Sequence, residues 1–289
     1  MNPYRSYVAR LAQLIAEGQA LPLGALPPRP KPEIPPHAPV GLVFSPHPDD
    51  ECVVGALPLR LLRQNSMRLV NIAVTLGSRP ERRAPRHEEL KNACHYIGFE
   101  LELLAPDGLE KIHPAARTDD PAHWNRCVQI IAGLLARRRP RLIFFPHQAD
   151  WHPTHIGTHF LVMDALKAQP AEFETLLIET EFWRPMAAPN LMVELSLDDA
   201  ADLLAALSFH VGEVRRNPYH LRLPAWWLDN VRRGAELVGG PGAVAPDFLF
   251  ATLYRARRWR NKQVQECFTG GQSIGASDSP AAAFGWSAD

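Results

Sequence analysis

Short apolar runs alternate along the chain with longer segments in which apolar residues recur every three or four positions. Such runs are typical of buried strands, and they occupy residues 40–44, 68–76, 100–105, 141–145, 175–181 and 192–195. The helical spacing predicts helices at about 50–65, 86–97, 121–138, 155–168 and 198–216, with a loop at 78–86. This alternation predicts an α/β fold with a Rossmann-like, doubly wound and mostly parallel sheet.

The two ends of the chain differ from this central region. Apolar residues in 1–20 have helical spacing, and prolines crowd residues 21–39, which predicts a helix followed by a stiff connector. Residues 270–289 are rich in Gly, Ser and Ala, a composition typical of flexible segments. We therefore expect three parts: an N-terminal helix and connector over 1–38, a main domain over 39–268 and a flexible tail over 269–289.

Composition and charge narrow the classes of function. Hydrophobic residues make up 46% of the chain and charged residues 21%, as in ordinary soluble globular proteins. The 31 Lys and Arg residues balance the 31 Asp and Glu residues, so we expect no nucleic-acid partner and interpret the basic run 255–262 as a solvated face. No apolar stretch has the length of a signal-peptide core or a membrane span.

The four cysteines have neither the spacing of a zinc ribbon nor the density of a disulfide scaffold. Cys52, Cys94 and Cys127 lie in apolar helical contexts, and we interpret them as small buried hydrophobic residues. Together with the lack of an export signal, this predicts a cytoplasmic protein.

Candidate chemistry follows two of the predicted strands. His47, Asp49, Asp50 and Glu51 come after the run at 40–44, and a second group that includes His152 and His155 comes after 141–145. The acids of the first group alone are also typical of a helix N-terminus. Helix capping does not explain why histidines and carboxylates follow both of these strands. Because ligands of open α/β sheets bind at the carboxyl ends of the strands, we predict a metal site there.

These segments resemble the PIG-L (LmbE-like) family of zinc-dependent de-N-acetylases. The resemblance spans roughly residues 38–255 and rests on His47-Pro48-Asp49-Asp50-Glu51, Val74-Thr75-Leu76-Gly77, the segment from Arg86 to Gly98, His152-Pro153-Thr154-His155 and Ala206-Leu207-Ser208-Phe209-His210. One departure concerns Thr154, which stands where the family commonly has an acid. Asp150, two residues before His152, is a candidate replacement for that acid.

The resemblance implies a role for each matched residue. His47, Asp50 and His155 would be the metal ligands, and Asp49 the general base. His152 would stabilise the oxyanion or protonate the leaving amine. Two neutral imidazoles and one carboxylate suit Zn²⁺ but also Fe²⁺, and they leave the ion a net positive charge that lowers the pKa of a bound water.

Three further residues are candidates for substrate contacts, and each has a structural alternative. Glu51 can cap a helix or hold a loop, and Arg86 can pair with Glu89 on its own helix. Asp150, like His147, can support a metal ligand from behind. We interpret His159 as structural and His210 as a helix-surface residue, although the resemblance would place His210 at the lining of the site.

From the resemblance we expect hydrolysis of an N-acetylglucosamine-type sugar, in a small molecule or a glycoconjugate, to acetate and a free amine. Two alternatives stay open: a metal-dependent hydrolase of another amide or ester, and a non-catalytic metal- or sugar-binding protein. A dinucleotide enzyme is disfavoured because no Gly-x-Gly-x-x-Gly follows the first strand. The sequence leaves the sugar acceptor undecided and a homo-oligomer open.

Overall fold

The sheet at the centre of the molecule is mixed: most neighbouring strands are parallel, and every antiparallel pair in the described residues involves β7. The computed structural model describes residues 2–30 and 32–286. Within them the strand order is β3-β2-β1-β4-β5-β7-β6-β9, and β8 pairs with β7. The strands are β1 (Val40–Ser45), β2 (Arg68–Ala73), β3 (Glu100–Leu103), β4 (Leu142–Pro146), β5 (Thr175–Thr180), β6 (Leu191–Glu194), β7 (Ala251–Arg260), β8 (Gln263–Glu266) and β9 (Gln272–Ile274).

Strands β1 to β5 run parallel, which confirms the predicted doubly wound sheet. The chain leaves β1 toward β2 and β3, and then crosses back so that β4 pairs with the other side of β1. The point where the order reverses therefore lies between β1 and β4. Along the series β4-β5-β7-β6-β9, β7 is antiparallel to both of its neighbours, β5 and β6. The other strands of this series in the described residues all run in the same direction.

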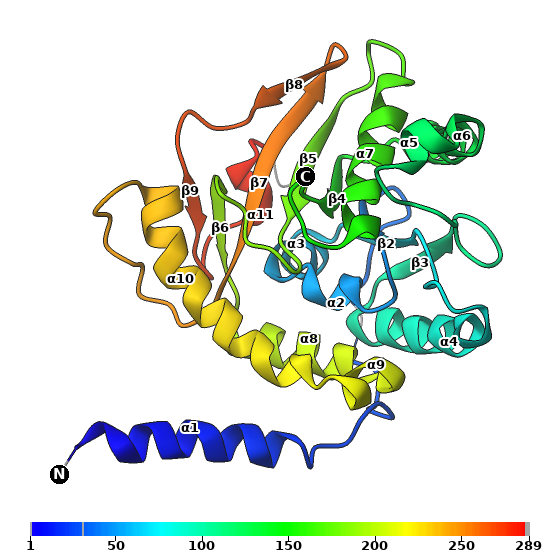
Figure 1. Cartoon of the computed structure of the whole chain (residues 1–289). Helices are drawn as coiled ribbons and strands as arrows, with labels where there is room; N and C mark the ends of the chain where they lie inside the picture. The colour runs from blue at the N-terminus through cyan, green and yellow to red at the C-terminus, as the bar shows by residue number, and fades with distance from the viewer. Residues whose placement is uncertain (1, 31, 287–289) are drawn as a thin grey trace.

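Helices cover both faces of this sheet (Figure 1). They are α1 (Tyr4–Gly18), α2 (Asp50–Val53), α3 (Ala56–Asn65), α4 (Pro80–Ile97), α5 (Ala116–Asp119), α6 (Pro121–Arg138), α7 (Pro153–Lys167), α8 (Leu197–Ser208), α9 (Val211–Arg216), the 3₁₀ helix η1 (Tyr219–Arg222), α10 (Leu223–Gly239) and α11 (Pro280–Ala283). One core joins the sheet to α3, α4, α8 and α10, and a second joins its other face to α6 and α7. Alternate residues of β1 point to the two cores, Val43 to the first and Leu42 to the second.

Several predicted boundaries are wrong, for identifiable reasons. Most of the loop expected at 78–86 belongs to α4, which begins at Pro80. Proline is tolerated in the first turn of a helix because the N–H group that it lacks would have no intrahelical partner there. The helix expected at 50–65 is broken at Gly55, whose φ of 89° is left-handed and whose added Cβ would lie 2.4 Å from Thr252. The helix expected at 198–216 is broken at His210, which turns inward.

The basic run 255–262 is not simply a solvated face. Most of it belongs to β7, which lies inside the sheet between β5 and β6. Buried Ala256 and Trp259 lie among its arginines and belong to the two opposite cores, and Arg257 forms an ion pair with Glu179 on β5. Apolar residues on both faces of the strand, rather than the charge of the run, are what a strand inside a sheet requires.

The prediction of a flexible tail over 269–289 is wrong for most of that segment. Strand β9 pairs with β6, and Phe284 is buried against Phe268 and Trp286. Arg60 of α3 is almost fully buried, and it donates to the backbone carbonyls of residues 274, 275, 276 and 278. Residues 287–289 lie outside the described part of the chain.

The N-terminal helix extends away from the rest of the molecule (Figure 1). Helix α1 leaves Tyr4, Tyr7 and Leu14 largely exposed. The connector that follows is fastened by an ion pair between Arg29 and Asp202 of α8. In the described residues, a helix with the length and hydropathy needed to span a bilayer is not found.

We predict that Arg60→Met lowers the free energy of unfolding by about 2–3 kcal/mol, because bonds from a charged donor to buried carbonyls are lost. Urea denaturation measures the change, and hydrogen exchange should rise first in residues 272–279. Arg126→Met, at an exposed position of α6, is the matched control. Equal stability of the two variants would contradict the role given to Arg60.

Candidate active site

The loop between β1 and α2 presents the first group of predicted site residues. It follows directly from β1, and residues 46–49 turn so sharply that Asp49 has a φ of 116°, a strained value for a residue with a side chain. The backbone N–H of His47 donates to Asp50 Oδ2 over 2.8 Å. The turn therefore brings His47, Asp49 and Asp50 to the same edge of the sheet.

Neighbouring elements hold this loop in its strained form. Thr75 Oγ1 donates to the carbonyl of Pro46 over 2.7 Å, and Arg86 Nη2 donates to that of Pro48 over 3.0 Å. The N–H of Asp49 donates to Glu51 Oε2 over 2.9 Å. Arg86 thus donates a hydrogen bond to the loop itself. Its ion-pair partner is Glu213, whose Oε1 lies 3.9 Å from Arg86 Nε, and not Glu89 as the sequence suggested.

Glu51 is locked in place by a buried partner from far along the chain. Its Oε1 lies 2.6 Å from His210 Nε2, and both side chains are fully buried. Burial lowers the pKa of His210, but the charge of Glu51 and the hydrogen bond to it, together with the charges of nearby acids, outweigh burial and raise the pKa, which favours an ion pair with Glu51. His210 is therefore not the helix-surface residue that the sequence indicated.

Cys52 completes a second cluster with Glu51 and His210, but this cluster does not have the character of a metal site. The thiol of Cys52 donates to Glu51 Oε1, and burial raises its pKa well above the usual value. A protonated thiol and a direct His–Glu bond leave no free donors pointing at a common centre. The cluster serves to anchor the loop.

The junction of β4 and α7 provides the second group. His152 caps α7, because its Nδ1 accepts the N–H of Thr154 over 3.2 Å. In a neutral ring the proton then sits on Nε2, which is free to donate. Burial and the neighbouring His47 and His155 lower the pKa of His152 to about 4, so the ring is neutral near pH 7.

Three of the predicted ligands converge on one position. His47 Nδ1 lies 3.2 Å from His155 Nε2, Asp50 Oδ2 lies 3.3 Å from His155 Nε2, and His47 Nδ1 lies 3.5 Å from Asp50 Oδ2. Two donors on a tetrahedral ion with bonds of about 2.0–2.1 Å lie about 3.3 Å apart. The three atoms thus have the spacing of one face of a tetrahedral zinc site, and the residues present fit such an ion.

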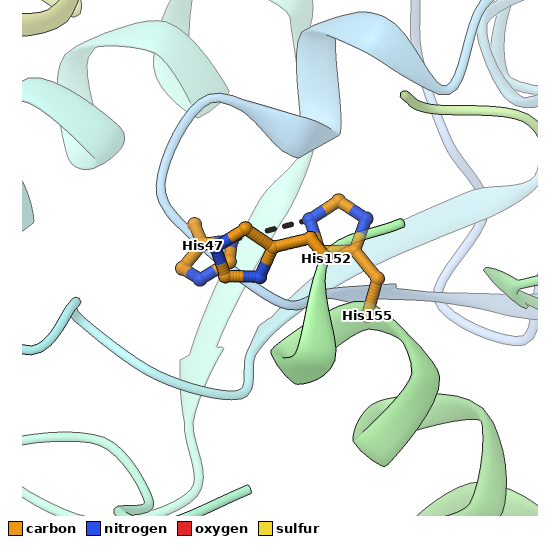
Figure 2. A group of neighbouring side chains, drawn as sticks. All are labelled: His47, His152 and His155. Atoms are coloured by element: carbon orange, nitrogen blue, oxygen red, sulfur yellow. Dashed lines mark hydrogen bonds between the residues drawn. The ribbon is translucent and has the colours of Figure 1, made fainter. Parts of the chain in front are cut away.

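The three histidines are grouped at the start of α7 and the loop after β1, as Figure 2 shows. Donor atoms of His47, His152 and His155 all lie within 4.8 Å of one another. The rings of His47 and His152 meet edge to face, with centroids 4.6 Å apart. His152 therefore lies beside the predicted ligands, within reach of a group held there.

Asp150 occupies the position expected of a support for His155. Its Oδ2 lies 3.7 Å from His155 Nδ1 and accepts the N–H of Trp183, while Oδ1 accepts the N–H of His152. A proton on Nδ1 facing this carboxylate leaves Nε2 to face the site. This geometry matches a replacement for the acid missing at Thr154.

Asp49 stands apart from the ligand triangle and has an unusual acidity. Burial, followed by the adjacent charge of Asp50, raises the pKa of Asp49 to about 7. The Tyr219 hydroxyl donates to its Oδ2 over 2.7 Å. Tyr219 was missed by sequence reasoning, since it is 170 positions away and no local pattern marks it.

A wide polar cleft of about 880 Å³ opens over these residues. Its lining includes His47, Asp49 and His152, together with a concentration of basic side chains: Arg79, Arg82, Arg83, Arg86, Lys111 and Arg216. Glu213 pairs with Arg82 and Arg216, and Glu110 pairs with Arg83. The cleft has the size of a small-ligand site.

We predict that His210→Ala lowers the free energy of unfolding by about 3–5 kcal/mol, because it leaves the charge of Glu51 buried and unpaired. Adding Glu51→Gln should recover part of the loss, since the stranded charge is removed. Urea denaturation of both variants tests this, with His37→Ala at an exposed position as control. A loss as small as that of the control would show that the pair is not an anchor.

Comparison with known proteins relates part of this chain to a described family. The family model described as PIG-L, GlcNAc-PI de-N-acetylase, matches residues 42–166. A comparison with curated protein sequences gave no significant match.

Solved structures with low sequence identity share the fold. A conserved protein from Thermus thermophilus has a TM-score of 0.56 and 19% identity, covering 76% of this chain and 94% of its own. The N,N'-diacetylchitobiose deacetylase from Pyrococcus horikoshii has a TM-score of 0.55 and 15% identity, covering 76% and 84%. The 4-carboxy-2-hydroxymuconate hydratase from Pseudomonas putida has a TM-score of 0.55 and 16% identity, covering 75% and 95%.

The matched residues 42–166 contain both loops that carry the predicted ligands, from His47 to His155. The predicted resemblance to the PIG-L family is thereby confirmed over residues 42–166, and the chain shares the α/β fold of these solved structures.

Proposed function

We propose that the protein is a metal-dependent hydrolase that cleaves the amide of an N-acylated sugar of the N-acetylglucosamine type. The observation that carries the proposal is the triangle of His47, Asp50 and His155, with Asp49 beside it at a pKa of about 7. A set of three ligands with a separate carboxylate nearby is the arrangement that metal-assisted hydrolysis needs.

The donor set supports zinc as the ion, and it also accommodates Fe²⁺. When bound, such an ion supplies a Lewis acid that polarises the substrate carbonyl and lowers the pKa of water. The charge of Asp50 supports this assignment. Burial alone would raise its pKa, but the field of His155 and hydrogen bonds from His155 and His47 hold the pKa below its usual range, so the carboxylate stays ionised.

Asp49 is proposed as the general base. A carboxylate with a pKa of about 7 accepts a proton from the attacking water near neutral pH and can release it to the leaving amine. Tyr219 orients it by donating to Oδ2. The Glu51–His210 pair acts through the backbone of Asp49, because Glu51 accepts the N–H of that strained residue.

His152 is proposed to stabilise the developing oxyanion. Its Nδ1 accepts the N–H of Thr154, so a neutral ring presents Nε2–H on its other side. Placement at a helix N-terminus fixes the ring, and a fixed donor stabilises charge in the transition state better than a mobile one. Thr154 contributes through its backbone, which makes the loss of the family's acid compatible with activity.

The polar cleft is the proposed sugar site. Sugar hydroxyls need many donors and acceptors, and this cleft offers them around His47, His152 and the guanidinium groups. The fold alone does not select the reaction, since a hydratase shares it. The family match over the ligand-bearing segment favours de-N-acylation.

Asp49→Asn tests the mechanism. We predict that it lowers kcat for acetate release from N-acetylglucosaminides by about 10²–10⁴-fold, because the amide cannot accept the proton. Elemental analysis should find the same metal content as in the wild type. His155→Ala should lose metal as well as activity, and Asp119→Asn at an exposed position is the matched control. Full activity in Asp49→Asn would remove Asp49 from the mechanism.

A further inference from the structure

A second, smaller cavity borders the site and shares lining residues with the sugar cleft. Its volume is about 180 Å³, and aromatic and aliphatic side chains form most of its wall: Val53, Val54, Phe182, Trp183, Tyr219, Leu223, Trp226, Trp227 and Leu253. These residues come from α2, the segment after β5, η1, α10 and β7. The proposed function does not use this cavity.

The polar groups along this wall are already bonded elsewhere. Glu181 binds Arg233, Asn230 donates to the carbonyl of Ala251, and Thr252 donates to Tyr254. Arg222, the remaining charged residue apart from Asp49 and Asp50, is exposed at the rim. The cavity therefore offers an apolar occupant burial and offers a hydroxyl-rich sugar little.

The two cavities share three residues: Asp49, Asp50 and Trp183. The apolar wall also reaches the ligand triangle, because the ring of Phe182 packs edge-on against His155 with centroids 5.0 Å apart. An amide held at these carboxylates has two sides, the amine and the acyl chain. The sugar amine belongs in the polar cleft, which directs the acyl chain into the apolar cavity.

The size of the cavity exceeds what an acetyl group fills. An engineered apolar cavity of about 150 Å³ accommodates benzene, whereas acetyl would place a single methyl group here. An empty apolar space of this size forfeits packing contacts and stability. The inner wall is fixed by Trp227, which is buried against Phe250, and the partly exposed ring of Trp183 packs on Tyr219.

We propose that the acyl group removed by this protein is longer than acetyl, an apolar chain or ring of about six carbons. The inference rests on the proposed function and names the substrate class of that site. Water would cleave the amide C–N bond, its oxygen remaining on the acyl carbon as a carboxylate and both of its protons passing to the sugar amine, which leaves as an ammonium.

The test compares kcat/KM of the metal-loaded protein for N-acetyl-, N-butanoyl- and N-hexanoylglucosamine. Each buried methylene contributes about fourfold, so we expect hexanoyl to exceed acetyl by at least about tenfold. Leu223→Trp, which fills the cavity from α10, should lower the hexanoyl-to-acetyl ratio by about tenfold or more. Leu228→Trp, on the same helix but exposed and outside the cavity, should leave the ratio unchanged.

A wild type that prefers acetyl would overturn this inference while leaving the proposed function intact. If no N-acylglucosamine is cleaved, the proposed function fails. A binding measurement then tests separately whether the cavity takes an apolar chain. Isothermal titration calorimetry of the metal-loaded protein with hexanoate and with acetate measures the two affinities. Binding of hexanoate at least about tenfold tighter than acetate, and weakened by Leu223→Trp, would support the apolar site. Equal affinities would overturn it.

Discussion

The site depends on the pairing of β1 with β4. These two parallel strands are neighbours although about a hundred residues separate them, because the chain first builds β2 and β3 on the far side of β1. Their carboxyl ends therefore face the same cleft, and the loop of His47 and the cap of α7 meet there. Without this reversal of strand order, the donor triangle could not form from segments so far apart in the sequence.

A strained loop at such a position needs support from several directions. The carbonyls of Pro46 and Pro48 are fixed by Thr75 and Arg86, and the N–H of Asp49 is fixed by Glu51. The cost of the positive φ at Asp49 is thus offset by contacts from the segment after β2, from α4 and from the α8–α9 junction. Glu51 and Arg86, candidates for substrate contacts in the sequence, have these structural partners in the fold.

Local patterns predicted the elements better than the contacts between them. The apolar runs located β1 and β4, and the amphipathic pattern located α6 from Pro121 to Arg138, because burial of one face imposes a period on the sequence. The motifs also identified His47, Asp50 and His155 as a group of candidate metal ligands. Tyr219 and the apolar cavity could not be found this way, since they depend on how η1 and α10 pack against a loop 170 positions earlier.

The buried guanidinium of Arg60 links the order of synthesis to the completion of the fold. Its acceptors at residues 274 to 278 lie more than two hundred positions downstream, so they leave the ribosome long after α3. Until then this charged side chain has Gln64 of its own helix and later the carbonyl of Glu194 as partners, and water must satisfy the rest of its donors. Contacts of such long sequence separation close slowly, and α3 follows directly on the loop that carries Asp49 and Asp50. Docking of the last strand is accordingly the step that dehydrates Arg60 and fixes the helix behind the site.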